Sequence, residues 1–407
     1  MLFSDVIGQS EIKQQLIDMA SQNRLSHAIL LLGPEGSGSL ALAMAFANFV
    51  SCIPDPSSKH NGPALMVFDE NSPEHLKLPE NPKDADNWMS SRSTFSKLSA
   101  MVHPDIHFSY PVIPRKSGDK PLSTDYASEW RSFVTQYPYG NVYDWLQFIG
   151  AENKQGNITA HECNDIIRKL YLKSFESRYK ILVMWMPEYL GNEGNKLLKL
   201  IEEPPPDTLF LFVAENESQI LPTILSRTQL VKVPSPTVDE IEEGLIRFAN
   251  VSPEQARQAA SISQGNYREA LQVLQHAEED WQALLRDWLN AALKTGPIAQ
   301  VRWVEEIGRL GREKQKQFLR YFNHLLEQAV RLEILGDLHL NMSASEMDFA
   351  ARLNKIADVS QQQAIIEELD RAVYYIERNA HAKMLFMSLT IRLYHIIANK
   401  ENIILNE

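Results

Sequence analysis

The stretch LLLGPEGSGSLALA, residues 30–43, carries the strongest indication of fold class in this chain. An apolar run, residues 28–32, leads through a glycine-rich turn into an Ala/Leu-rich segment. A buried strand, a glycine loop and a helix in this order are the context in which the pattern G-x-x-x-x-G-K-[ST] binds nucleotide phosphates. Gly33 and Gly38 have the spacing of that pattern, which predicts a P-loop type α/β domain.

The two positions that carry the chemistry of such a loop hold other residues. Ser39 replaces the lysine that neutralises phosphate charge, and Leu40 replaces the hydroxyl that binds Mg²⁺. An opposite charge at contact distance contributes about 4 kcal/mol near a protein surface, which a serine cannot supply. An ordinary tight turn is the alternative interpretation of the loop in isolation, although its N–H groups could still form an anion nest. We expect a vestigial phosphate loop of Gly33, Gly36, Gly38 and Ser39, with no functional nucleotide and no cofactor.

The end of a second predicted strand supports this interpretation. Residues 180–186, KILVMWM, form a continuous apolar run typical of a strand buried on both faces. In a working P-loop ATPase this strand ends in an aspartate that holds Mg²⁺. Here the strand ends in Met186 and Pro187. The nearest acid is Glu188, which resembles a surface or capping residue. We therefore expect no ATP hydrolysis by the isolated chain.

Strand and helix patterns alternate through the first part of the chain, which predicts a mainly parallel, doubly wound sheet. The apolar runs expected to form strands are residues 28–32, 103–113, 180–186 and 208–215 and the end of 218–233. Two polar insertions, residues 53–100 and 114–156, interrupt this pattern and indicate no particular role. After residue 234 the sequence is all-helical. The expected domains are an α/β domain at 1–234, a small helical lid at 235–277 and an all-α domain at 278–407.

The composition limits the functions that remain. The net charge is −12, from 40 basic and 52 acidic residues, and this disfavours strong direct binding to DNA. There is no secretion signal and no apolar run of the roughly 18 residues that a membrane span needs, so we expect a cytoplasmic protein. Cys52 and Cys163 do not indicate a disulfide framework. We expect no metal, because four histidines show no ligand spacing: His60, His75, His103 and His107.

Six phrases occur in a recognisable order: VIGQSEIKQQL, RLSHAILLLGPEGSGS, HPDI, NKLLKLIEEPP, ILPTILSRTQL and GNYREAL. In these phrases the chain resembles the bacterial clamp-loader AAA+ subunits of DNA polymerase III, and among them the delta-prime class. That class keeps an arginine that acts on a neighbouring subunit while its own nucleotide site decays. The match covers residues 1–52, 101–113 and 157–275. After residue 275 the chain resembles the family only in being helical, as is expected for the family's collar domain.

The resemblance implies roles for two arginines. Arg227 matches the arginine of the family's Ser-Arg-Cys motif, with Thr228 in place of the cysteine. An arginine between a short helix and an edge strand points away from its own pocket, and as a finger on another subunit's ATP it would be worth about 10³–10⁵ in rate. The alternative is a solvated arginine in a turn. Arg268 matches the sensor-2 arginine of the lid, for which we expect a packing role. Family members often carry a four-cysteine zinc module, but Cys52 stands alone here.

The resemblance implies a non-hydrolysing subunit of the DNA polymerase III holoenzyme. Its partners would be gamma/tau and delta type subunits in a hetero-oligomeric ring, and indirectly the sliding clamp and primer-template DNA, with no membrane. An active AAA+ ATPase motor of the gamma/tau type is the first alternative, and the absence of a lysine at Ser39 counts against it. A DNA-repair adaptor of AAA+ shape is the second, and the negative net charge counts against it.

Overall fold

The computed structural model describes residues 1–54, 78–116, 118–151, 154–275, 280–335, 344–377 and 380–399. The chain divides into two compact units. The first consists of Met1–Ile241 together with Gly265–Arg268, and the second of Glu242–Gln264 together with Glu269–Glu407. In the described part of the chain, no helix is both long and apolar enough to cross a membrane.

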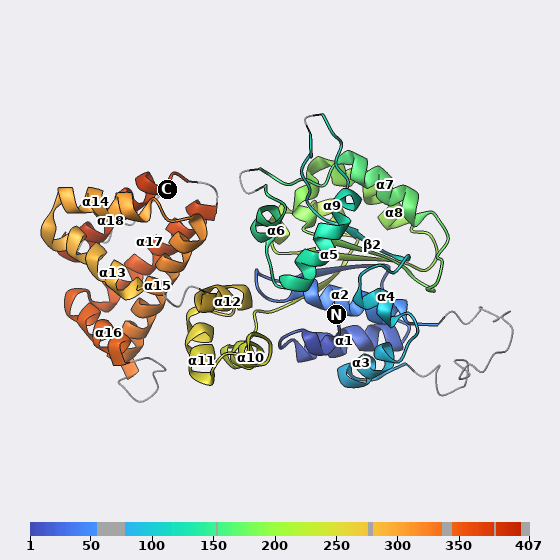
Figure 1. The fold of residues 1–407 in the computed structure, drawn as a ribbon, viewed down its shortest axis with the longest axis horizontal. Coiled ribbons are helices and arrows are strands. Elements are labelled where there is room, and N and C mark those ends of the chain that lie inside the picture. Colours follow the sequence, from blue (N-terminus) through green and yellow to red (C-terminus); the bar gives the residue numbers. More distant parts are fainter. Residues whose placement is uncertain are drawn as a thin grey trace. The chain divides into compact units, whose positions relative to one another are not determined.

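The first unit is built on a five-stranded parallel sheet with the strand order β2-β3-β4-β1-β5 (Figure 1). Neighbouring strands pair in register, with Ala28 opposite Phe210 and Ile29 opposite Gln229. The strands are β1 (Ala28–Leu32), β2 (Ile106–Ser109), β3 (Lys180–Trp185), β4 (Thr208–Ala214) and β5 (Gln229–Lys232). The parallel, doubly wound α/β fold of AAA+ type is therefore confirmed.

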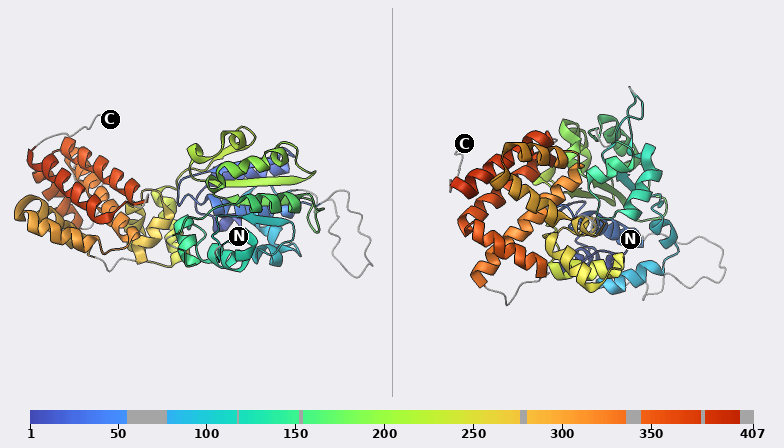
Figure 2. Two further views of the ribbon diagram at one scale, coloured as in Figure 1. Left: turned by 90° about the horizontal axis from the view of Figure 1, so that it is seen from above. Right: turned by 60° about the vertical axis from the view of Figure 1, so that its left-hand side comes forward.

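Helices cover both faces of this sheet (Figures 1 and 2). They are η1 (Phe3–Asp5), α1 (Ser10–Ser21), α2 (Ser39–Ser51), α3 (Pro82–Ser90), α4 (Phe95–Ser99), η2 (Ser123–Tyr126), α5 (Ala127–Gln136), α6 (Val142–Phe148), α7 (Ala160–Leu170), η3 (Pro187–Leu197), α8 (Leu198–Glu202), η4 (Glu217–Gln219) and α9 (Pro222–Leu225). Successive strand residues point to opposite faces, so Ile181 and Val183 join one apolar core while Leu182 joins the other. This explains why β3 and β4 are buried throughout and are apolar after their first residues, Lys180 and Thr208.

Strand β2 is shorter than the apolar run at residues 103–113 predicts. Pro104 and Pro111 lack the N–H that a ladder hydrogen bond needs, and they lie on either side of the strand. After Pro111 the chain turns away, and Val112 forms an isolated antiparallel bridge with Asn157. That bridge ties together the two ends of the insertion at residues 114–156.

The remaining helices begin with α10 (Val238–Gly244), whose first residues still belong to the first unit. The others are η5 (Leu245–Ala249), α11 (Pro253–Ile262), α12 (Tyr267–Gln275), α13 (Trp281–Asn290), η6 (Ala291–Thr295), α14 (Pro297–Ile307), α15 (Arg312–Leu335), α16 (Ala344–Ile356), α17 (Val359–Glu377) and α18 (Ala382–Asn399). Helix α11 starts with a reciprocal capping box between Ser252 and Gln255. The core of the second unit is mainly aliphatic but contains a group of aromatic rings, among which those of Trp288 and Trp303 are stacked 4.7 Å apart.

Candidate functional site

The glycine loop between β1 and α2 has kept the backbone geometry of a phosphate loop. Gly36 and Gly38 have φ angles of +75° and +85°, which residues with a side chain rarely adopt. At Gly33 a Cβ atom would lie 2.6 Å from the carbonyl oxygen of Val233, so only glycine allows the loop to come this close to the segment that follows β5. The three glycines are therefore required by the fold, whether or not a phosphate binds.

The serines of the loop are hydrogen-bonded within the protein. The hydroxyl groups of Ser37 and Ser39 lie 2.8 Å apart, and both residues are buried. The side-chain amide of Gln9 donates to the carbonyl oxygens of Ser37 and Pro234, which fastens the loop to the start of α1 and to the chain after β5. The hydroxyl of Ser39 thus already has a partner, and no ammonium group stands at this position.

The space enclosed by the loop is almost filled. The cavity lined by the loop, the ends of β3 and β4 and residues 138–140 measures about 20 Å³, which is close to the volume that one water needs. The ring of Tyr139 takes up the space beside the loop, because a Cβ atom at Gly38 would lie 2.8 Å from its Cε1 atom. The Tyr139 hydroxyl accepts a 2.7 Å hydrogen bond from the N–H of Ile7, and burial raises the pKa of this phenol.

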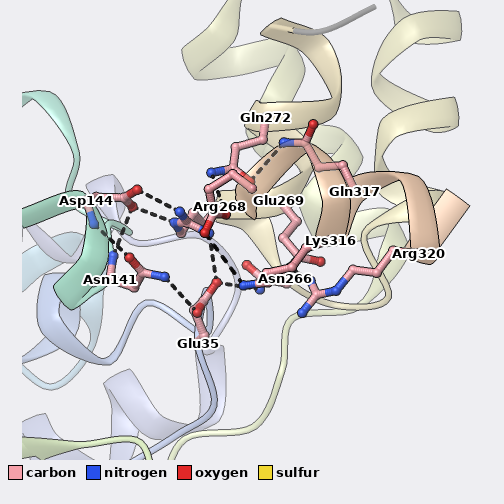
Figure 3. Close-up of polar contacts among 11 residues, drawn as sticks. Glu35, Asn141, Asp144, Asn266, Arg268, Glu269, Gln272, Lys316, Gln317 and Arg320 are labelled. Atoms are coloured by element: carbon pink, nitrogen blue, oxygen red, sulfur yellow. Dashed lines mark hydrogen bonds and ion pairs between the residues drawn. The ribbon is translucent and has the colours of Figure 1, made fainter. Parts of the chain in front are cut away.

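Arg268 lies beside this loop within the first unit (Figure 3). Its guanidinium forms a bidentate ion pair with Asp144, with Nη2 and Oδ1 2.6 Å apart. Its Nη1 donates to Glu35 of the loop over 3.0 Å. Asn266 and Asn141 each donate a side-chain N–H to the same Glu35 carboxylate, at 3.2 and 2.9 Å. One loop carboxylate therefore joins two segments that are far apart in the sequence.

The end of β3 is packed against apolar side chains. Trp185 lines the cavity, and its ring lies 5.2 Å from Trp130 and 6.0 Å from Phe133. Glu188 does not line the cavity. Its Oε1 accepts hydrogen bonds from the backbone N–H groups of Glu215 and Asn216, at 2.7 and 2.9 Å, so it caps the end of β4. Burial raises the pKa of this carboxyl, against the effect of those hydrogen bonds.

Arg227 lies in the turn between α9 and β5, at the amino end of this edge strand. Its Nε atom lies 2.6 Å from Oε1 of Glu202, and Nη1 donates to the carbonyl oxygen of Thr223 over 2.8 Å. The phosphate loop follows the carboxyl end of β1, which runs parallel to β5. The four residues of β5 alone span about 13 Å, so Arg227 is separated from its own loop by the length of the strand.

The thiols and imidazoles lie in unreactive environments. Cys52 and Cys163 are free and buried, and burial raises the pKa of each thiol to about 11. Burial lowers the pKa of His103, and that of His107 to about 4. His60 and His75 fall outside the described residues. Within the part that is described, no group of three His, Cys, Asp or Glu side chains could hold a metal ion.

The structure thus gathers Gly33, Gly36, Gly38, Ser39 and Arg268 at the carboxyl ends of the strands and sets Arg227 apart at the amino end of β5. Sequence reasoning missed the residues that hold Arg268 and fill the cavity, among them Glu35, Tyr139 and Asp144. The only local signal was the pattern Asn141-Val-Tyr-Asp144, a capping box at the start of α6. It indicates where a helix begins, but it does not indicate that Asp144 also binds Arg268.

The parallel sheet with a glycine loop between β1 and α2 defines a P-loop type α/β domain of the AAA+ class. The family described as "DNA polymerase III, delta subunit" matches residues 8–237, which is more than half of the chain. The chain therefore belongs to this family.

Several known proteins are similar to this chain. DNA polymerase III subunit delta′ of Bacillus subtilis (strain 168) is 24% identical over 270 residues, 66% of this chain and 60% of that protein. Subunit tau of the same organism is 23% identical over 333 residues, 80% of this chain and 46% of that protein. Subunit delta′ of Escherichia coli (strain K12) is 28% identical over 138 residues, 34% of this chain and 40% of that protein. The matched regions thus span less than two thirds of each relative.

A solved structure of the Thermotoga maritima RuvB Holliday junction branch migration motor matches 87% of this chain and 84% of its own, with 14% identity and a TM-score of 0.36.

Proposed function

We propose that this chain is a non-hydrolysing subunit of the sliding-clamp loader of DNA polymerase III, and that Arg227 acts on the ATP of a neighbouring subunit. Membership of the delta-subunit family and the similarity to delta′ and tau subunits support the assignment. The proposed partners are gamma/tau and delta type subunits in a hetero-oligomeric ring in the cytoplasm, which acts on the sliding clamp and primer-template DNA. In this assembly residues 1–234 form the AAA+ domain, 235–277 the lid and 278–407 the collar.

The observation that carries this proposal is the position of Arg227. The side chain is on the surface, 33% exposed, at the amino end of edge strand β5, whereas its own phosphate loop follows the carboxyl end of β1. A planar guanidinium there can offer two parallel N–H groups to a phosphate on another molecule. It would stabilise the charge that develops on the transferred phosphoryl group while water attacks it, and the neighbouring subunit would supply the metal and the lysine.

The chain's own loop supports the non-hydrolysing part of the proposal. Ser39 offers no positive charge, Leu40 offers no metal ligand, and the cavity has room for about one water. An ATPase needs all three features, so the role left to this AAA+ domain is to assemble with other subunits and to contribute to their sites.

The test is ATP hydrolysis by the reconstituted loader in the presence of clamp and primed DNA. Arg227→Ala should lower this stimulated rate and leave assembly, checked by gel filtration, unchanged. Arg178→Ala is the matched control, because Arg178 is also partly exposed and paired with an acid, Asp207, at 3.2 Å. A stimulated rate that is the same for wild type, Arg227→Ala and Arg178→Ala would show that the subunit contributes no finger.

A further inference from the structure

The insertion at residues 114–156 is part of the core of the first unit. Tyr110, just before it, stacks on Trp130 with ring centroids 4.0 Å apart. Trp145 donates its indole N–H to the carbonyl oxygen of Pro111 over 2.7 Å. Both tryptophans are fully buried, in the same apolar cluster as α2 and one face of the sheet. The insertion is thereby packed against the end of β3, next to the phosphate loop.

Tyr139 belongs to this insertion and lies in the space beside the phosphate loop. The ring lies against Gly38 on one side and 4.7 Å from the ring of Tyr267 on the other. Its hydroxyl is fixed by the N–H of Ile7. A buried aromatic ring with its one polar atom hydrogen-bonded is a stable occupant of a cavity. What remains open has about the volume of one water.

The guanidinium of Arg268 binds carboxylates of the protein in the way that it would bind an anionic ligand. Its guanidinium makes a bidentate pair with Asp144 and a third bond to Glu35, so its N–H groups meet carboxylates at the geometry that phosphate oxygens would also satisfy. Two carboxylates, those of Asp144 and Glu35, face this one guanidinium at the mouth of the loop. A polyphosphate would meet like charge there as well as a filled cavity.

We propose that the insertion is a built-in substitute for a nucleotide. Tyr139 occupies the cavity, Asp144 and Glu35 take the place of phosphate as the partners of Arg268, and the segment Gly265–Arg268 is thereby held to the phosphate loop with no ligand bound. The segment also contacts the loop through its backbone, because the N–H of Tyr267 donates to the carbonyl oxygen of Gly36. This proposal does not depend on the role of Arg227.

Hydrogen exchange of two backbone amides tests the proposal in the full-length protein. Exchange of the Tyr267 N–H reports whether the segment Gly265–Arg268, which Asp144 binds through Arg268, stays bonded to the phosphate loop. Exchange of the Ile7 N–H reports whether the Tyr139 hydroxyl stays in place. Asp144→Asn should speed exchange of Tyr267 by about tenfold, the effect of weakening one charge-assisted hydrogen bond. Tyr139→Phe should speed exchange of Ile7 by a similar factor. Millimolar ATP or ADP with Mg²⁺ should change neither amide in the wild type.

Asp125→Asn is the matched control. Asp125 lies in the same insertion and caps η2 by accepting from the N–H of Leu122 at 2.8 Å, much as Asp144 caps α6 by accepting from Asn141. It should leave the exchange of Tyr267 unchanged. If Asp144→Asn disturbs the whole insertion, exchange throughout α5 will reveal it, and Glu35→Gln then tests the same hold from the loop side. Exchange of Tyr267 that is unchanged in both variants, or slowed by nucleotide in the wild type, would overturn the proposal.

Discussion

Arg227 and Glu202 form an ion pair on the surface of the first unit, with Nε of the arginine 2.6 Å from Oε1 of the glutamate. Glu202 is 46% exposed and ends α8, directly before the Pro-rich turn that leads to β4. Exposed ion pairs contribute about 0–1 kcal/mol, so this pair can exchange for a phosphate at little cost.

The first prediction concerns the shape of the guanidinium. Arg227→Lys keeps the charge but replaces a planar fork with a point charge, so it should restore only a small part of the stimulated ATPase rate lost in Arg227→Ala. Steady-state phosphate release by the reconstituted loader measures this. A rate for Arg227→Lys equal to that of wild type would mean that charge alone is sufficient.

The second prediction concerns Glu202. Glu202→Gln removes the charge of a half-exposed partner, so the free energy of unfolding should change by less than about 1 kcal/mol. The stimulated ATPase rate should stay within about twofold of wild type, because the variant leaves the guanidinium intact. Urea unfolding and the loader assay test the two parts separately. A loss of rate as large as that in Arg227→Ala would instead make Glu202 a positioning residue for the finger.

The third prediction is that restoring the motif will not restore the enzyme. The double variant Ser39→Lys with Leu40→Thr recreates the phosphate-loop pattern, yet the purified protein should hydrolyse no ATP above a blank without enzyme. Tyr139 still fills the cavity and Asp144 still engages Arg268. Hydrolysis by the double variant, and not by wild type, would show that the two missing side chains were the whole obstacle.

The fourth prediction concerns the aromatic core of the insertion. Phe133 is fully buried in α5 among Trp130, Trp145 and Trp185. Phe133→Ala should lower the free energy of unfolding by about 3–5 kcal/mol, because it removes a large apolar group and leaves a cavity. Gln136→Ala, on the exposed side of the same helix, should change it by less than about 0.5 kcal/mol. Equal urea midpoints for the two variants would contradict the packing described.

The fifth prediction is a pH dependence that arises from Glu162 in α7. Burial raises the pKa of this carboxyl above its usual 4.5, although it accepts a 2.9 Å hydrogen bond from the N–H of Ser123. An acid with a raised pKa binds its proton more tightly in the folded state. Its stabilising effect is therefore fully present below pH 4.5 and is lost as the pH rises through the folded pKa.

Glu162→Gln removes this titration and should gain stability relative to wild type as the pH increases from 4.5 to 8, by about 1.4 kcal/mol for each unit of the pKa shift. Urea unfolding of both proteins across this range measures the difference. A difference in unfolding free energy that stays constant with pH would show that Glu162 has the same pKa in both states.

The last prediction concerns the zinc content of the protein. Cys52 has no second thiol near it in the sequence and is a buried free thiol in the structure. Elemental analysis of the purified protein should find less than stoichiometric zinc, since a structural site needs four ligands. One zinc per chain, retained through a chelator wash, would show that the segment around residues 53–100 holds a metal.

Local signals in the sequence were sufficient for the sheet and the loop. The runs at residues 28–32, 181–185 and 209–214 are continuously apolar because both faces of each strand are buried, and this pattern is visible without the fold. The glycines of the loop follow from the tight path between β1 and α2. Arg227 is placed beside an edge strand by the order of elements alone. The missing lysine at Ser39 is likewise a matter of sequence.

The occupant of the nucleotide site was decided by tertiary structure. Asp144 and Arg268 are 124 residues apart, and nothing local distinguishes Asp144 from any other acid that caps a helix. In the sequence, nothing distinguishes Tyr139 from the other aromatic residues of the polar insertion. Both reach the loop only because a buried cluster of aromatic rings holds the insertion against the end of β3. Such a pairing depends on which surfaces the folded chain brings together, and short-range patterns of polarity carry no record of it.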